Sequence, residues 1–157
     1  MNAPSPQELR ALLRLRAMRE EAAQALLARR RDEMAACQRI VDERVAQITR
    51  ARRARHALMD WLSSHGAAAA PRVEAFAGAR REALDDELER AAADLIDERN
   101  DLRDATQQFE EARLAWLREH GRHLAVARLD EELQRARARA AEERIEREAE
   151  PRRPLEI

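Results

Sequence analysis

The chain of 157 residues has one cysteine (Cys37), three glycines, four aromatic residues, and no tyrosine or lysine. A single cysteine excludes a disulfide within the chain. No apolar run approaches the roughly 18 residues of a membrane-spanning helix. The first residues also lack the basic region and apolar core of a secretory signal peptide. We therefore expect a cytoplasmic protein that does not insert into a membrane.

Motifs for enzymatic chemistry are also lacking. There is no glycine-rich phosphate loop and no set of serine, histidine and aspartate spaced for nucleophilic catalysis. The carboxylates recur along repetitive polar segments, whereas acid–base catalysis needs a buried or closely paired group whose pKa is shifted. We therefore expect no enzyme activity, no catalytic residue and no cofactor.

The clearest pattern in the sequence is a seven-residue spacing of apolar residues. Charged residues make up 39% of the chain, and alanine supplies much of its 45% hydrophobic content, a composition typical of long helices. Between Arg81 and Val126, apolar residues recur every seven positions, as in a coiled coil. One series is Leu88, Leu95, Leu102, Phe109 and Trp116 (the Leu88 series). The other is Leu84, Ala91, Glu98, Ala105, Ala112, Glu119 and Val126 (the Leu84 series).

An earlier segment supplies a partner helix. Ser5-Pro6-Gln7-Glu8 has the form of a capping box, with proline at the first helical position. No proline or glycine follows until Gly66. The apolar residues of this segment also keep a seven-residue spacing, interrupted by Glu20 and Arg55: Leu13, Leu27, Met34, Val41, Ile48 and Leu62 (the Leu13 series).

A short break separates the two helices. Gly66, four alanines and Pro71 are typical of a helix end followed by a new start. The sequence therefore predicts an all-α fold in which two long helices form an antiparallel coiled-coil hairpin. We expect one hairpin over residues 1–150, with helices at about 6–64 and 72–149, a turn at 65–71, and a disordered tail at 151–157.

Several features of the hairpin also follow from the sequence. Pairing Leu62 with Phe76 sets Glu20 near Trp116 and sets Arg50, Arg52 and Arg53 beside the acidic residues 85–87. An interior glycine costs about 1 kcal/mol in a helix, so we expect Gly121 to be a weak point and Gly78 to loosen the first turns. Around Gly121 the apolar phase shifts to Leu117, Leu124, Leu129 and Leu133. Beyond about residue 130 we expect the second helix to be unpaired.

Metal and nucleic-acid sites are both expected to be absent. His120 and His123 are three residues apart, but a metal site needs further ligands and Cys37 lies far along the pairing. We expect His123 to close the core and His120 to be exposed. The arginines at 29–31 and 50–55 lack interleaved aromatics, and acidic residues lie opposite, so salt bridges explain them better than phosphate contacts.

Two surfaces are candidates for partner binding. Residues 8–31 carry seven arginines against three acids, a net +4, and Leu15 lies off the core series. This end therefore has apolar residues on more than one face, rimmed by arginine. At the hairpin bend, Trp61 and Phe76 either close the end of the core or form a docking surface.

The arrangement resembles a known family. An Arg/Leu-rich start (residues 12–19, Leu-Leu-Arg-Leu-Arg-Ala-Met-Arg), a nearly uninterrupted first helix, a short break and a longer charged second helix resemble the FliJ/YscO (SctO) stalk proteins of type III secretion. The resemblance implies a coupling subunit that engages the pore of a hexameric secretion ATPase and the inner-membrane export gate. It implies a location at the cytoplasmic side of that apparatus.

The resemblance also assigns the two surfaces. It implies ATPase binding by Arg10, Leu12, Arg14, Leu15, Arg16 and Arg19. It implies export-gate binding by Trp61, Val73 and Phe76. We expect a monomer when the protein is free. Other readings stay open: a secretion chaperone or escort that holds an exported substrate on residues 130–150, or a coiled-coil scaffold.

Overall fold

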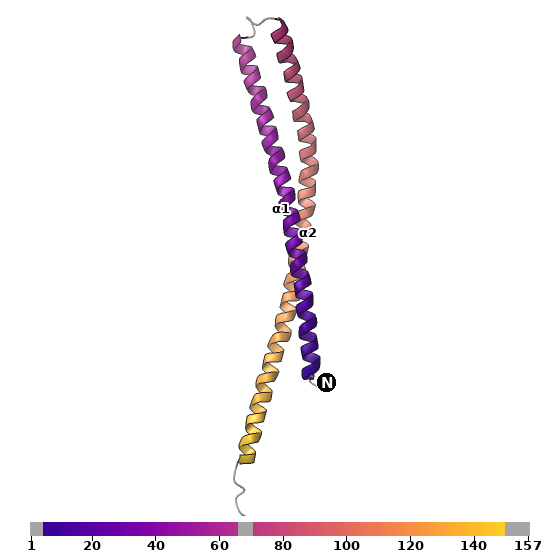
Figure 1. The fold of residues 1–157 in the computed structure, drawn as a ribbon, viewed down its shortest axis with the longest axis vertical. Coiled ribbons are helices and arrows are strands. Elements are labelled where there is room, and N and C mark those ends of the chain that lie inside the picture. Colours follow the sequence, from indigo (N-terminus) through magenta and orange to yellow (C-terminus); the bar gives the residue numbers. More distant parts are fainter. Residues whose placement is uncertain (1–4, 66–70, 150–157) are drawn as a thin grey trace, which may run out of the picture. The chain divides into compact units, whose positions relative to one another are not determined.

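A computed structural model describes residues 5–65 and 71–149 of the chain. These residues form two helices, α1 (Pro6–His65) and α2 (Pro71–Ala149). The predicted all-α hairpin with a longer second helix is confirmed, and the helix bounds differ by one residue at the break (Figure 1). Residues 66–70 of the predicted turn and the predicted tail at 151–157 lie outside the described residues.

The two helix starts follow from local chemistry. The Ser5 N–H donates to Glu8 Oε2 at 2.8 Å, and the Glu8 N–H donates to Ser5 Oγ at 3.2 Å. This capping box satisfies donors that no helical carbonyl reaches. The backbone and side-chain hydrogen bonds from Ser5 lower the pKa of Glu8. α2 begins at Pro71, where the missing N–H costs nothing, and Glu74 lies in its first turn.

The predicted core positions are confirmed on α2. Every member of the Leu88 and Leu84 series is buried or half-buried. Leu84, Ala91 and Ala112 are the most deeply buried of them. The acidic residues between these positions are largely exposed. A narrow stripe along α2 therefore packs against α1, as a two-helix coiled coil requires.

On α1 the structure shows a second core series that includes charged residues. It starts at Leu9, which is 1% exposed, and none of its members is exposed. The series is Leu9, Arg16, Ala23, Arg30, Cys37, Arg44, Ala51 and Leu58 (the Leu9 series). Three arginines at core spacing concealed it, because a search for apolar periodicity passes over charged residues.

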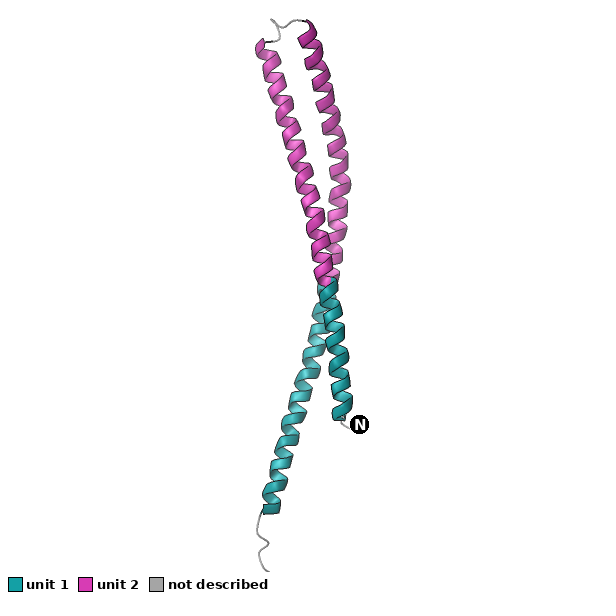
Figure 2. Ribbon diagram, in the orientation of Figure 1, with its two compact units in different colours: residues 1–26, 113–157 teal, residues 27–112 magenta. Residues whose placement is uncertain are grey.

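The chain divides into two compact units (Figure 2). Unit 1 comprises residues 1–26 and 113–157, and unit 2 comprises residues 27–112. Within each unit, one segment of α1 packs against one segment of α2. In unit 1, Leu9 is the deeply buried apolar residue, and every residue from 134 to 149 is exposed. The expectation that the end of α2 is unpaired is confirmed.

In unit 2, small and branched residues fill the interface. Val41 and Ile48 of α1 and Ala77 of α2 are buried, together with the α2 residues already named. Alanine at these positions lets the two backbones approach closely but buries little area per residue. The stability of unit 2 therefore depends on many small contributions instead of a few large side chains.

The pairing register is close to the predicted one. Arg44 pairs with Asp94 at the offset predicted for Leu62 and Phe76, and other pairs fall within about one turn on either side of it. Arg55 pairs with Asp85 at 2.6 Å, whereas Arg50, Arg52 and Arg53 make no ion pair with residues 85–87. In unit 1, Glu20 contacts His120, and His120 stacks on Trp116, so Glu20 lies near Trp116 as predicted.

The glycines do not interrupt α2. The helix is continuous through Gly78 and Gly121. The predicted phase shift at Gly121 was also wrong, since Leu117, Leu124 and Leu129 are exposed. The half-buried positions continue at the original spacing: His123, Val126, Asp130 and Leu133. The residues of α2 that face α1 therefore keep the seven-residue spacing through Gly121. No described helix contains a stretch long and apolar enough to cross a membrane.

Candidate partner-binding surfaces

The side of each helix on which a residue lies can be read from its place in the heptad. Gln47 and Glu87, which immediately precede the core residues Ile48 and Leu88, are hydrogen-bonded across unit 2 at 3.3 Å. Residues that precede the Leu13 and Leu88 series therefore share one side of an antiparallel pair, here called the Gln47 side. A residue that lies one or four positions after a member of the Leu13 or Leu88 series is on the opposite side of the helix pair.

The predicted ATPase-binding residues lie on the α1 segment of unit 1. Arg10, Arg14 and Arg19 are exposed and make no ion pair in the described part of the chain. Leu12 and Leu15 are exposed by 37% and 43%. Met18 and Leu26, which were not among the predicted binding residues, are also exposed on this segment. Leu12, Arg19 and Leu26 repeat every seven residues on the Gln47 side, so they form a stripe beside the core.

Arg16 departs from the predicted surface. It belongs to the Leu9 series, and its NH1 lies 3.6 Å from Glu119 Oε2. Both side chains are mostly buried between α1 and α2. Because Arg16 faces α2, it stabilises the helix pair and is not available to a partner in this conformation.

The α2 segment of unit 1 has its own exposed apolar stripe. Leu114, Leu117 and Leu124 are all exposed, and Gly121 lies among them at helical spacing. Leu117 and Leu124 immediately follow core residues, so they lie on the side opposite Leu12 and Leu26. Unit 1 therefore presents leucines on two sides. The sequence analysis assigned Leu117 and Leu124 to packing and did not identify Leu114.

A charged cluster lies inside unit 1. Glu20 Oε1 is 2.6 Å from His120 Nδ1, and Glu20 Oε2 contacts His123 Nδ1. The hydrogen bonds from both histidines lower the pKa of Glu20, whose side chain is only 18% exposed. His120 also stacks on Trp116, with ring centroids 5.1 Å apart.

This cluster corrects one expectation. His120 was predicted to be exposed, but it is half-buried because Glu20 and Trp116 hold it against the interface. Glu20 was read as a break in the core series, although its carboxylate satisfies both imidazoles. The sequence signal for this cluster was a glutamate at a core position of the first helix opposite a His-x-x-His pair in the second. Among residues 5–65 and 71–149, no group of three or more His, Cys, Asp or Glu is placed to hold a metal ion.

The predicted gate-binding residues lie in unit 2 beside the break. Trp61 and Val73 are partly exposed, and Phe76 is 74% exposed. Trp61 and Val73 precede core positions, so both lie on the Gln47 side, and Phe76 is one turn from Val73. Trp61 stacks on His65, with ring centroids 5.7 Å apart. Trp61 and Phe76 were expected either to close the end of the core or to form a docking surface. Because both side chains are exposed, they do not close the core.

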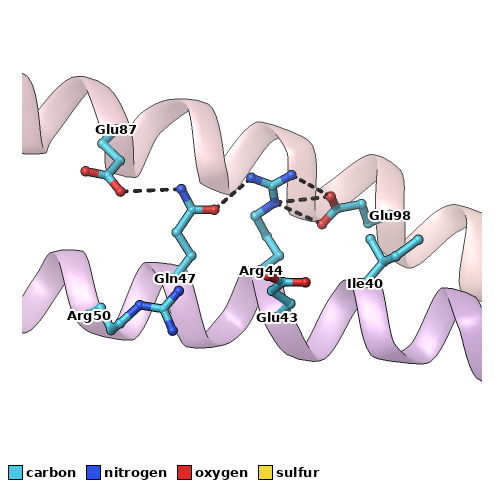
Figure 3. Close-up of a pocket in the computed structure, with 7 residues that line it drawn as sticks. All are labelled: Ile40, Glu43, Arg44, Gln47, Arg50, Glu87 and Glu98. Atoms are coloured by element: carbon cyan, nitrogen blue, oxygen red, sulfur yellow. Dashed lines mark hydrogen bonds and ion pairs between the residues drawn. The ribbon is translucent and has the colours of Figure 1, made fainter.

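A polar hollow of about 400 Å³ lies on the Gln47 side of unit 2 (Figure 3). Arg44 Nε donates to both Glu98 oxygens at 3.1 Å, and its NH2 lies 2.8 Å from Oε1. The hydrogen bonds to Glu98 raise the pKa of Arg44. Arg44 NH1 also donates to Gln47, which donates to Glu87. All these groups satisfy one another, so the hollow fixes the helix register and offers no reactive group.

The chain matches no protein-family model, no curated protein and no solved structure. The function must therefore be argued from the exposed surfaces of the two units.

Proposed function

We propose that the protein is a central stalk of a bacterial type III secretion apparatus, which couples a hexameric secretion ATPase to the export gate. The observation that carries the proposal is the surface of unit 1. Leu12, Leu15 and Leu26 are exposed on α1, and Leu117 and Leu124 are exposed on the other side of the pair. A helix pair that functioned alone would gain nothing from leucines on two sides.

The charge of this surface supports the same function. Arg10, Arg14 and Arg19 lie on the same segment of α1 as Leu12, Leu15 and Leu26, and none forms an ion pair in the described part of unit 1. Apolar contacts rimmed by arginine are typical of protein interfaces, whereas a solvated coiled-coil face carries paired charges. The hairpin fold and the Arg/Leu-rich start agree with the resemblance to the FliJ/YscO stalk proteins.

ATP hydrolysis by the cognate secretion ATPase, measured with and without this protein, tests the proposal. We expect a several-fold stimulation by the unaltered protein. The triple variant Arg10→Glu, Arg14→Glu, Arg19→Glu should stimulate little, because it reverses the rim without touching the core. Arg16 is left unchanged, since its loss would weaken the helix pair.

A matched control reverses three exposed arginines of unit 2 that form no ion pair among residues 5–65 and 71–149: Arg39→Glu, Arg53→Glu and Arg80→Glu. It makes the same change in net charge and should stimulate as the unaltered protein does. Equal loss in both triple variants would show a general charge effect. Absence of stimulation and of co-elution with a confirmed hexameric ATPase would exclude the stalk function.

Binding to the export gate is a separate part of the proposal and is assigned to Trp61, Val73 and Phe76. Phe76→Ala should weaken binding to the purified cytoplasmic domain of the gate, while Ile40→Ala, another exposed residue of unit 2, should not. The chaperone alternative receives less support. Its expected site over residues 130–150 carries Leu133 and Ile145 as its large apolar residues, too few to hold a substrate's amphipathic segment.

A further inference from the structure

A second groove of unit 2, on the side opposite the polar hollow, is unlike the other described surfaces of that unit. It has a volume of about 360 Å³ and is lined by Val45, Ile48, Thr49, Arg52, Ala92, Leu95, Ile96 and Arg99. Its floor is apolar, since Ile48 is buried and Leu95 is half-buried beneath it. Val45 and Ile96 rise on its two sides and are exposed by 41% and 62%.

The charges of the groove are of one sign. Arg52 and Arg99 line it, and neither forms an ion pair in the described part of the chain. No carboxylate is among the lining residues. On the opposite side of unit 2, by contrast, Arg44 is fully paired with Glu98 and Asp94. The groove therefore lacks the acidic complement that the other side supplies internally.

The two arginines lie at opposite ends of the groove. Arg44 lies opposite Glu98, and Arg55 opposite Asp85. Arg99 is therefore about level with the α1 turn before Arg44, and Arg52 lies about ten residues further along. At 1.5 Å per residue this separation is roughly 15 Å along the axis, or about three helical turns. Val45 and Ile96 lie between the two charges.

We infer that this groove binds an amphipathic helix of a partner protein. The helix would present apolar residues at i, i+3 or i+4, and i+7, with an acidic residue at each end about three turns apart. Apolar side chains would pack between Val45 and Ile96 over the floor formed by Ile48 and Leu95. The terminal carboxylates would pair with Arg52 and Arg99.

A second copy of the chain fits this groove less well. The exposed apolar parts of Val45 and Ile96 are far smaller than the roughly 800 Å² per partner that a stable dimer buries. Two such grooves face to face would also bring together four lining arginines and no lining carboxylate. A single short helix needs only the area available and supplies the missing charges.

Binding of a synthetic helical peptide, measured by fluorescence anisotropy with the full chain, tests the inference. The peptide carries leucines at i, i+4 and i+7 and a glutamate pair at each end. A second peptide replaces each glutamate by lysine. We expect the acidic peptide to bind at least tenfold more tightly than the basic one. Ile96→Ser should weaken that binding several-fold, and Arg52→Glu with Arg99→Glu should abolish the preference for the acidic peptide.

Ile40→Ser is the matched control, because Ile40 is similarly exposed but lines the polar hollow on the other side of unit 2. It should leave peptide binding unchanged. Equal affinity for the two peptides, or equal effects of Ile96→Ser and Ile40→Ser, would overturn the inference. So would sedimentation that shows a dimer in the unaltered protein and a monomer after Ile96→Ser, since a second copy would then occupy the groove. None of these measurements involves the ATPase.

Discussion

Replacement of Gly121 by alanine should stabilise the protein. The structure places Gly121 inside a continuous helix, and a Cβ added there meets nothing within 4 Å. The substitution therefore gains helix propensity without a clash or a new contact. The expected gain is about 1 kcal/mol in the free energy of unfolding, or roughly 2–4 °C in Tm for a chain of this size. Thermal and urea unfolding followed by far-ultraviolet circular dichroism measure it.

Two variants calibrate this result. Gly78→Ala meets the same conditions in unit 2, since its added Cβ also has no neighbour within 4 Å, and should give a similar gain. Ala125→Gly, at an exposed position one turn from Gly121, should cost about 1 kcal/mol. If Gly78→Ala stabilises and Gly121→Ala is neutral or destabilising, α2 is not a regular helix at residue 121 in solution. The continuous helix at residue 121 would then be refuted.

Three further predictions concern packing, capping and pH. Leu84→Ala should lower the free energy of unfolding in urea by about 2–3 kcal/mol, because Leu84 is 2% exposed. Leu117→Ala should change it by less than about 0.5 kcal/mol. Equal losses in the two variants would contradict the assigned core face. Ser5→Ala should cost about 1 kcal/mol by removing one bond of the capping box, and no loss in thermal unfolding would show that the start of α1 is frayed. The pKa of Glu20 is lowered in the folded state, so its stabilising contribution is complete above its ordinary value of 4.5 and is lost as the pH falls through the folded pKa. In acid titrations of stability, the difference between the unaltered protein and Glu20→Gln should shrink over that range, and a constant difference would contradict the pairing with His120 and His123.

Much of the fold was determined by local sequence. The capping box at Ser5, the start of α2 at Pro71 and the Leu88 and Leu84 series each depend on residues close together in the chain. Such signals can be read directly, because a cap or a heptad stripe has the same physical meaning in any helix. The unpaired end of α2 could also be predicted from the lengths of the two helices, since α1 has too few residues to cover it.

Charged residues at core positions could not be interpreted from one helix alone. Arg16, Arg44 and Glu20 interrupt an apolar series, and a sequence pattern treats them as defects. In the structure Arg16 faces Glu119, Arg44 is bonded to Glu98, and Glu20 joins two histidines. Each pairing depends on which side chains of the opposite helix lie within reach, and the pattern along one helix does not show this.

The sequence by itself therefore determined the helices, their starts and most of the face that each one buries, because those properties follow from residues a few positions apart. Only the tertiary structure decided which charges meet and which leucines remain exposed. Exposure depends on what the opposite helix covers, and a displacement of one turn moves every partner by about 5 Å. For the same reason the groove between Val45 and Ile96 became visible only once both helices were in place.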